Sequence, residues 1–219
     1  VKFYFGWIVV LGSALTLMLG AGLMMIFGVF STSLIEEFQW SRTAISVGMS
    51  INTILLGVFG ALAGRLTDRY GSRIVITLGI LVSSIALYLL GYTSSLLDLY
   101  LLYGVLAGFG IICMQDVSTS AAVSRWFARR RSLALSLSSI GFCVGMVVFP
   151  SLAAYLIFLN GWRLAFQVLA GVILAIGLPV VVLAIRSHPK RGAVPSSDEM
   201  KINGIEVKTA PILVAAAIR

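Results

Sequence analysis

This sequence of 219 residues has very few charged side chains. Aspartate, glutamate, lysine and arginine together make up 11% of it, whereas 59% of the residues are hydrophobic and the mean hydropathy is +1.04. A water-soluble domain usually carries about 25% charged residues, because its surface must be solvated. The composition therefore excludes an ordinary soluble domain and predicts a chain that is surrounded mostly by lipid.

Residues that carry enzymatic and metal chemistry are also scarce. The sequence has one histidine, His188, and two cysteines, Cys113 and Cys143, both of which lie in apolar runs. No cluster of metal ligands and no nucleophile with a base appears, so we predict no metal site, no cofactor and no catalytic residue. The cysteines are expected to be packing residues rather than a disulfide. A six-helix membrane enzyme is thus a weak alternative.

The apolar residues form six long stretches, each near or above the roughly 20 residues that a helix needs to cross the hydrocarbon core. They predict an all-α polytopic membrane protein with six transmembrane helices. The first stretch is too long for the apolar part of a signal peptide, so we expect it to be a membrane helix. The stretches are 6–30, 42–63, 74–92, 98–124, 132–157 and 164–185.

The positive charges indicate how these helices are oriented. With the N-terminus in the cytoplasm, fourteen of the sixteen lysines and arginines fall on the inner side, and only Arg42 and Arg163 fall outside. This asymmetry is typical of cytoplasmic loops and predicts that both termini are cytoplasmic. It also accounts for the net charge of +8 through contacts with anionic membrane lipids, so no nucleic-acid partner is predicted.

A dense polar motif separates the second and third stretches. The run from Gly64 to Arg73 contains Asp68, Arg69 and Gly71 between two apolar segments, and we expect it to be a short inner loop with Asp68 near the start of the next helix. The run resembles the loop 2-3 signature of the major facilitator superfamily. The resemblance implies a conformational-switch motif made of Gly64, Asp68, Arg69, Gly71 and Arg73.

Two segments of the sequence are similar to each other. Ser31-Thr32-Ser33, Trp40 and Arg42 near the first outer connection are followed later by Ser118-Thr119-Ser120, Trp126 and Arg131 near an inner connection. Repeats of opposite membrane orientation are typical of transporters. Residues 1–186 are therefore expected to form inverted 3+3 repeats, the arrangement of one half of the superfamily's fold. Chance similarity in a biased composition is the alternative.

Residues 187–219 differ in composition from the rest. A polar run from Arg186 is followed by a short apolar segment from Thr209, which is too short to span a bilayer. We predict a cytoplasmic linker with a short amphipathic or apolar helix. In the resembled superfamily such a linker leads to a second, C-terminal six-helix half, which would be a partner from the same gene or a second chain.

Polar residues at membrane depth mark the candidate path for substrate or protons. Asp116 is the only ionisable residue in mid-span, and a charge at that depth is rare without a role. Gln115 and Thr119 lie beside it on the same predicted helix, and Asn52 and Thr16 are polar residues of the second and first helices. Each could instead bond a neighbouring helix as a packing residue.

Two further patterns bear on the mechanism. Gly141, Gly145 and Pro150 resemble part of the superfamily's helix 5 signature, although glycines at this spacing also serve any close helix pair. Gly104 stands where the superfamily's helix 4 signature often has an arginine, which weakens the case for the proton coupling associated with that arginine.

Several short segments along the chain resemble the prokaryotic branch of monocarboxylate porters and oxalate/formate exchangers. They include Gly6-Trp7, Glu37-Phe38 and Gly161-Trp162-Arg163. This resemblance implies secondary active transport of small organic anions across a bacterial inner membrane, by symport or exchange. Two alternatives stay open: a half-size protein that acts as a homodimer or does not transport, and a superfamily transporter of an unrelated substrate such as a drug or sugar. No cation lies in mid-span, so a cationic partner for the anion is expected from the second half.

Overall fold

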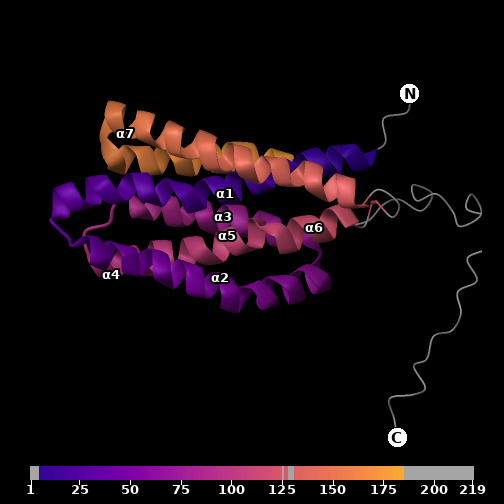
Figure 1. The fold of residues 1–219 in the computed structure, drawn as a ribbon, viewed down its shortest axis with the longest axis horizontal. Coiled ribbons are helices and arrows are strands. Elements are labelled where there is room, and N and C mark those ends of the chain that lie inside the picture. Colours follow the sequence, from indigo (N-terminus) through magenta and orange to yellow (C-terminus); the bar gives the residue numbers. More distant parts are fainter. Residues whose placement is uncertain (1–4, 125, 128–130, 185–219) are drawn as a thin grey trace, which may run out of the picture. The chain divides into compact units, whose positions relative to one another are not determined.

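The computed structural model describes residues 5–124, 126–127 and 131–184, and no strand occurs within these ranges. The predicted linker, 187–219, lies outside the described residues. Three long helices come first, then a chain of shorter ones, then a very long one (Figure 1). The helices are α1 (Phe5–Phe38), α2 (Arg42–Tyr70), α3 (Ser72–Leu90), α4 (Leu96–Leu99), the π-helix η1 (Tyr100–Ala107), α5 (Gly108–Met114), α6 (Asp116–Ser124) and α7 (Arg131–Ala184).

Five helical segments of the described residues are long and apolar enough to cross a membrane, judged by length and composition. They are Gly6–Phe38, Arg42–Tyr70, Ser72–Leu90, Leu96–Ser124 and Arg131–Ala184. The fourth combines α4, η1, α5 and α6. An all-α polytopic membrane fold is therefore confirmed.

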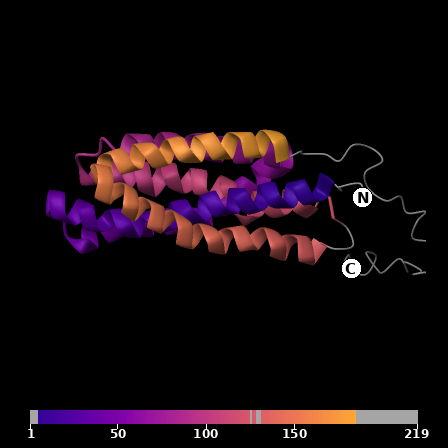
Figure 2. The ribbon, with the colours of Figure 1, turned by 90° about the horizontal axis from the view of Figure 1, so that it is seen from above.

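The long helix α7 folds back on itself at Gly161 (Figure 2). Gly161 has φ 78° and ψ 164°, a conformation that L side chains rarely adopt, so glycine is suited to this turn. The two limbs, 131–160 and 162–184, correspond to the fifth and sixth predicted stretches. The count of six spans stays a prediction, because it requires both limbs to cross the membrane.

Helix α1 lies at the centre of the bundle, where it contacts the limbs of α7 and the segments α5 and α6. Gly141 and Gly145 lie on the face of α7 that meets α1. A Cβ atom would lie 1.9 Å from the carbonyl oxygen of Ala14 at Gly141, and 2.2 Å from that of Met18 at Gly145. The two backbones therefore touch, and any side chain at these two positions would push them apart.

The prediction that the inner loop extends over 64–73 is wrong. Helix α2 continues to Tyr70, and α3 begins at Ser72, so the connection is the single residue Gly71 with φ 85°. Asp68 consequently lies in the last turn of α2 rather than at the start of α3. A carboxylate is less favourable there, whereas Arg69 in the same turn complements the helix dipole.

The fourth span, predicted over 98–124, is observed over Leu96–Ser124, but it is not a regular α-helix throughout. The chain is π-helical in η1 and breaks at Gln115, whose backbone is extended with ψ −172°. The carbonyl of Gln115 accepts a bond from the Thr119 amide at 3.3 Å, so a new helix, α6, starts at Asp116. π-helical segments and broken membrane helices often occur at functional sites of membrane proteins.

Candidate functional site

The switch motif and the candidate path meet where α2 packs on α6. Thr67 and Ser118 share a buried hydrogen bond between their hydroxyl oxygens, 3.0 Å apart. Three residues earlier on α2, a Cβ at Gly64 would lie 3.6 Å from Val117. The structure thus connects the end of α2 to the first turn of the helix that begins at Asp116.

The charged residues of the motif do not pair with one another. Asp68 and Arg69 are exposed, and Asp68 forms no ion pair within the described part of the chain. The Arg69 guanidinium lies 5.4 Å from the ring of Tyr70. Arg73 reaches the second limb of α7, where it donates a hydrogen bond to the carbonyl of Val182 at 3.3 Å. The motif therefore presents a carboxylate that has no ionic partner among the described residues.

Asp116 is exposed on the bundle rather than buried in it. It occupies the first turn of α6, where the helix dipole favours a negative charge. Gln115 is half-buried, and Thr119 is buried with its hydroxyl donating to the carbonyl of Gln115 at 3.2 Å. Of these three residues, only Asp116 is exposed.

The other two candidate residues are engaged inside the bundle. Asn52 is buried, and its Nδ2 donates to the carbonyl of Tyr103 in η1 at 3.0 Å. Thr16 is buried too, and its hydroxyl donates to the carbonyl of Gly12 at 2.8 Å. The structure does not bring these two side chains to the exposed surface of Asp116.

Replacing Asn52 with leucine is expected to lower thermal stability, because the carbonyl of Tyr103 would lose its side-chain donor in a buried place. The loss should be about 0.5–1.5 kcal/mol, the usual net contribution of one hydrogen bond, because the carbonyl of Tyr103 keeps the backbone amide of Gly108 as a donor. Thermal unfolding in detergent measures it. Thr53→Val is the matched control, since Thr53 is exposed and bonds only within its own helix. Unchanged stability with impaired uptake would instead indicate that Asn52 touches substrate.

Gly104 is explained by packing. A Cβ at this position would lie 2.9 Å from Cγ2 of Ile51, so α2 and η1 approach closely here. An arginine, as in the superfamily's helix 4 signature, would not fit without moving the two helices apart. The departure from the signature therefore belongs to this particular helix contact.

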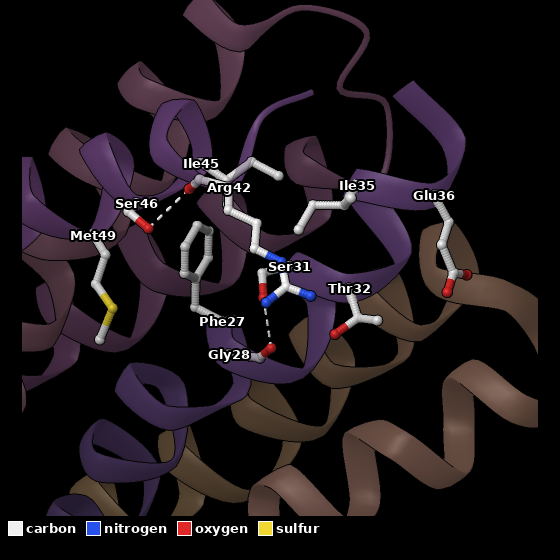
Figure 3. A pocket seen from close by; sticks show the side chains of 10 residues that line it. All are labelled: Phe27, Gly28, Ser31, Thr32, Ile35, Glu36, Arg42, Ile45, Ser46 and Met49. Carbon is white, nitrogen blue, oxygen red and sulfur yellow. Dashed lines mark hydrogen bonds between the residues drawn. The ribbon is translucent and has the colours of Figure 1, made fainter. Parts of the chain in front are cut away.

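A hollow of about 500 Å³ that the sequence did not indicate lies between the C-terminal part of α1 and the start of α2 (Figure 3). Its walls include Phe27, Ser31 and Thr32 from α1, and Arg42 and Met49 from α2. The guanidinium of Arg42 points from α2 towards Ser31 and Thr32, whereas the carboxylate of Glu36 points away at the far side. The sequence could not indicate this hollow, because its two walls come from different helices and Arg42 by itself resembles any charged residue at a helix end.

A cluster of charged and aromatic side chains joins the end of α1 to the turn of α7. Trp162 donates its indole N–H to one carboxylate oxygen of Glu37, and Arg163 pairs with the other at 2.5 Å. The Arg163 guanidinium also lies 4.5 Å from the ring of Trp162. Both residues follow Gly161, so the glycine turn places them against α1.

The chemistry of an enzyme is not assembled in the part of the chain that the structure describes. There, no three side chains of histidine, cysteine, aspartate or glutamate gather at a distance suited to a metal ion. Cys113 is buried and Cys143 is exposed, and both are free thiols.

Comparison with known proteins agrees with this arrangement of apolar helices. The sequence profile of the Major Facilitator Superfamily matches residues 12–218. Mouse monocarboxylate transporter 6 is 35% identical over 168 residues, which cover 77% of this chain and 36% of the relative. The riboflavin transporter RibJ of Trypanosoma brucei brucei is 32% identical over 205 residues, which cover 90% of this chain and 36% of the relative.

A Bacillus subtilis relative, the uncharacterized MFS-type transporter YcxA, is 28% identical over 163 residues, with 74% of this chain and 40% of the relative covered. The chain therefore spans only about a third to two-fifths of the length of these curated relatives. With its superfamily match, its transporter relatives and its membrane-length apolar helices, the chain is a multi-pass membrane protein, not an enzyme, and it belongs to the Major Facilitator Superfamily.

Proposed function

We propose that residues 1–186 form the N-terminal six-helix half of a secondary active transporter of small organic anions, with inverted 3+3 repeats. The observation that carries the proposal is the broken fourth span, in which Asp116 begins α6 as an exposed carboxylate next to the end of α2. Broken helices whose ends face a cavity are a recurrent feature of transporter substrate and ion sites. The relatives named as monocarboxylate transporters support an organic anion as substrate.

In this proposal Asp116 carries a proton or helps to bind substrate, with Gln115 beside it. The anion's cationic partner comes from the second half, because the arginines of the described helices lie near helix ends. Alternating access arises as this bundle rocks against its C-terminal partner, in the same gene or a second chain. Gly141, Gly145 and Pro150 stiffen the first limb of α7 against α1 during that motion.

The motif from Gly64 to Arg73 acts as a latch in this mechanism. Asp68 has no partner among the described residues, and it is exposed at the same end of the bundle as Arg73. A carboxylate in that state suits a contact with the second half that forms in one conformation and breaks in the other. The hydrogen bond between Thr67 and Ser118 then couples the latch to the helix of Asp116.

We further infer a cell membrane location, such as a bacterial inner membrane, with both termini in the cytoplasm. The basis is the distribution of lysine and arginine, which gather at one side of the predicted spans. The riboflavin transporter among the relatives favours one second candidate, a superfamily transporter of a larger, unrelated substrate.

Uptake by proteoliposomes tests the proposal. Residues 1–219 alone are expected to be helical by circular dichroism yet to accumulate no labelled lactate, formate or oxalate above empty liposomes, because half of the cavity wall and its cation are lacking. Joining the chain to a C-terminal six-helix half should establish saturable, competable uptake. Saturable uptake by residues 1–219 alone would contradict the half-transporter proposal and favour a functional homodimer, and uptake of riboflavin but no carboxylate would favour the second candidate.

A further inference from the structure

The hollow between α1 and α2 is separate from the surroundings of Asp116. Asp116 begins the helix that meets α2 at Gly64 and Thr67, near its C-terminal end. Arg42 is the first residue of α2 and lies about 33 Å from Gly64 along the helix, at a rise of roughly 1.5 Å per residue. A ligand of a few carbon atoms at Arg42 cannot touch Asp116.

Arg42 has no anionic partner among the described residues. Both arginines predicted to lie outside, Arg42 and Arg163, are close to acidic residues in sequence or space, but only Arg163 forms an ion pair, with Glu37. Glu36 also borders the hollow, yet it makes no ion pair and points away from Arg42 (Figure 3). The guanidinium of Arg42 therefore keeps its donors available to a bound anion.

The neighbours of this guanidinium complete a site with a polar end and an apolar wall. The hydroxyl of Thr32 forms no hydrogen bond within the described part of the chain, so it can donate to the same anion as Arg42. Phe27 supplies the apolar wall, and it is held in place by stacking on Tyr103 with ring centroids 3.8 Å apart. Met49 adds an apolar contact from α2.

From this arrangement we propose that the hollow binds a small organic monoanion, with its carboxylate on Arg42 and Thr32 and its carbon chain against Phe27. Arginine binds carboxylates well because its planar guanidinium can donate two parallel hydrogen bonds. The identity of the occupant rests on the proposed transport function, but the site itself does not. It is an outer binding station, reached before the path that contains Asp116.

The same geometry favours anions with one carboxylate over those with two. The carboxylate of Glu36 borders the far side of the hollow, and a second negative group on the ligand would be repelled by it. Ligands such as lactate should therefore bind better than succinate. Neutralising Glu36 removes this discrimination.

Equilibrium binding of radiolabelled lactate to the purified chain in detergent tests the site. Wild-type protein should bind saturably at low millimolar concentrations or better, and Arg42→Gln should weaken binding at least tenfold, whereas Arg42→Lys should retain part of it. Arg131→Gln is the matched control, since Arg131 is likewise an exposed arginine at the first residue of a helix but lies outside the hollow. Glu36→Gln should leave lactate binding in place and increase competition by succinate at least threefold.

Size-exclusion profiles and unfolding temperatures should match between Arg42→Gln and Arg131→Gln, which separates loss of the site from misfolding. Equal lactate binding in wild type and Arg42→Gln, or no saturable binding by wild type, would overturn the proposal. These experiments distinguish a failure of the binding site from a failure of the proposed transport function. If lactate binding depends on Arg42 but the assembled transporter does not transport lactate, the binding site is supported and the proposed function is contradicted. If uptake depends on Asp116 but not on Arg42, the proposed function is supported and the binding site is contradicted.

Discussion

Replacing Gly141 with alanine is expected to destabilise the bundle strongly. The new Cβ would lie 1.9 Å from the backbone carbonyl oxygen of Ala14, and a backbone atom cannot swing aside as a flexible side chain can. Helix α1 and the first limb of α7 would have to separate along a central contact. Overpacking of this kind lowers stability by about 1–3 kcal/mol or more.

The measurement is thermal unfolding in detergent, with the fraction of monodisperse protein as a second readout. Gly171→Ala is the matched control, because Gly171 lies on α7 as well and a Cβ there meets nothing within 4 Å. Alanine is the better helix former, so Gly171→Ala should leave stability unchanged or raise it slightly. If the two variants unfold at the same temperature, the close approach of α1 and α7 is not a source of stability.

Replacing Asp116 with asparagine is expected to have the largest effect on transport. The amide keeps the size of the carboxylate and one of its two acceptor oxygens, but it can neither take up a proton nor carry a charge. We therefore expect the assembled transporter to retain substrate binding, to transport at least tenfold more slowly and to lose most of the pH dependence of uptake. Because the side chain is exposed on the bundle, thermal stability should change little.

Asp98→Ala is the control for Asp116→Asn. Asp98 accepts a bond from the Ser95 amide at 3.0 Å, and the Ser95 hydroxyl accepts one from the Asp98 amide, so the two residues form a capping box at the start of α4. Its removal should lower stability by about 0.5–2 kcal/mol and leave the pH profile of uptake in place. An unchanged pH profile in Asp116→Asn, together with lower stability, would assign Asp116 to packing instead.

The positions of the helices could be read from the sequence with useful accuracy. Apolar runs gave the first four spans near their observed places, and Gly71 and Gly161 mark turns that need a positive φ. The ends were less accurate, since α1 runs on to Phe38 and α2 to Tyr70. Ionisable residues such as Glu37 and Asp68 can extend a helix beyond the apolar run, because hydropathy measures the lipid-facing length and not the backbone hydrogen bonds.

The candidate site was predictable only in part. Asp116 was identified because a lone carboxylate in an apolar run is rare, and the switch motif because its charges and glycines are dense. The roles of Asn52 and Arg42 were not predictable in the same way. Asn52 bonds a carbonyl 51 residues away, and Arg42 faces a hollow whose other wall belongs to α1.

The sequence by itself determined that lipid surrounds most of this protein, which superfamily it belongs to and where its spans approximately lie. These properties follow from composition and from local runs of residues. The tertiary structure alone decided where the fourth span breaks, which of Arg42 and Arg163 is neutralised, and why residue 141 must be glycine. Each of these outcomes depends on atoms that are far apart in the chain. Glu37 and Arg163 are separated by 126 residues, and no local pattern indicates that they meet.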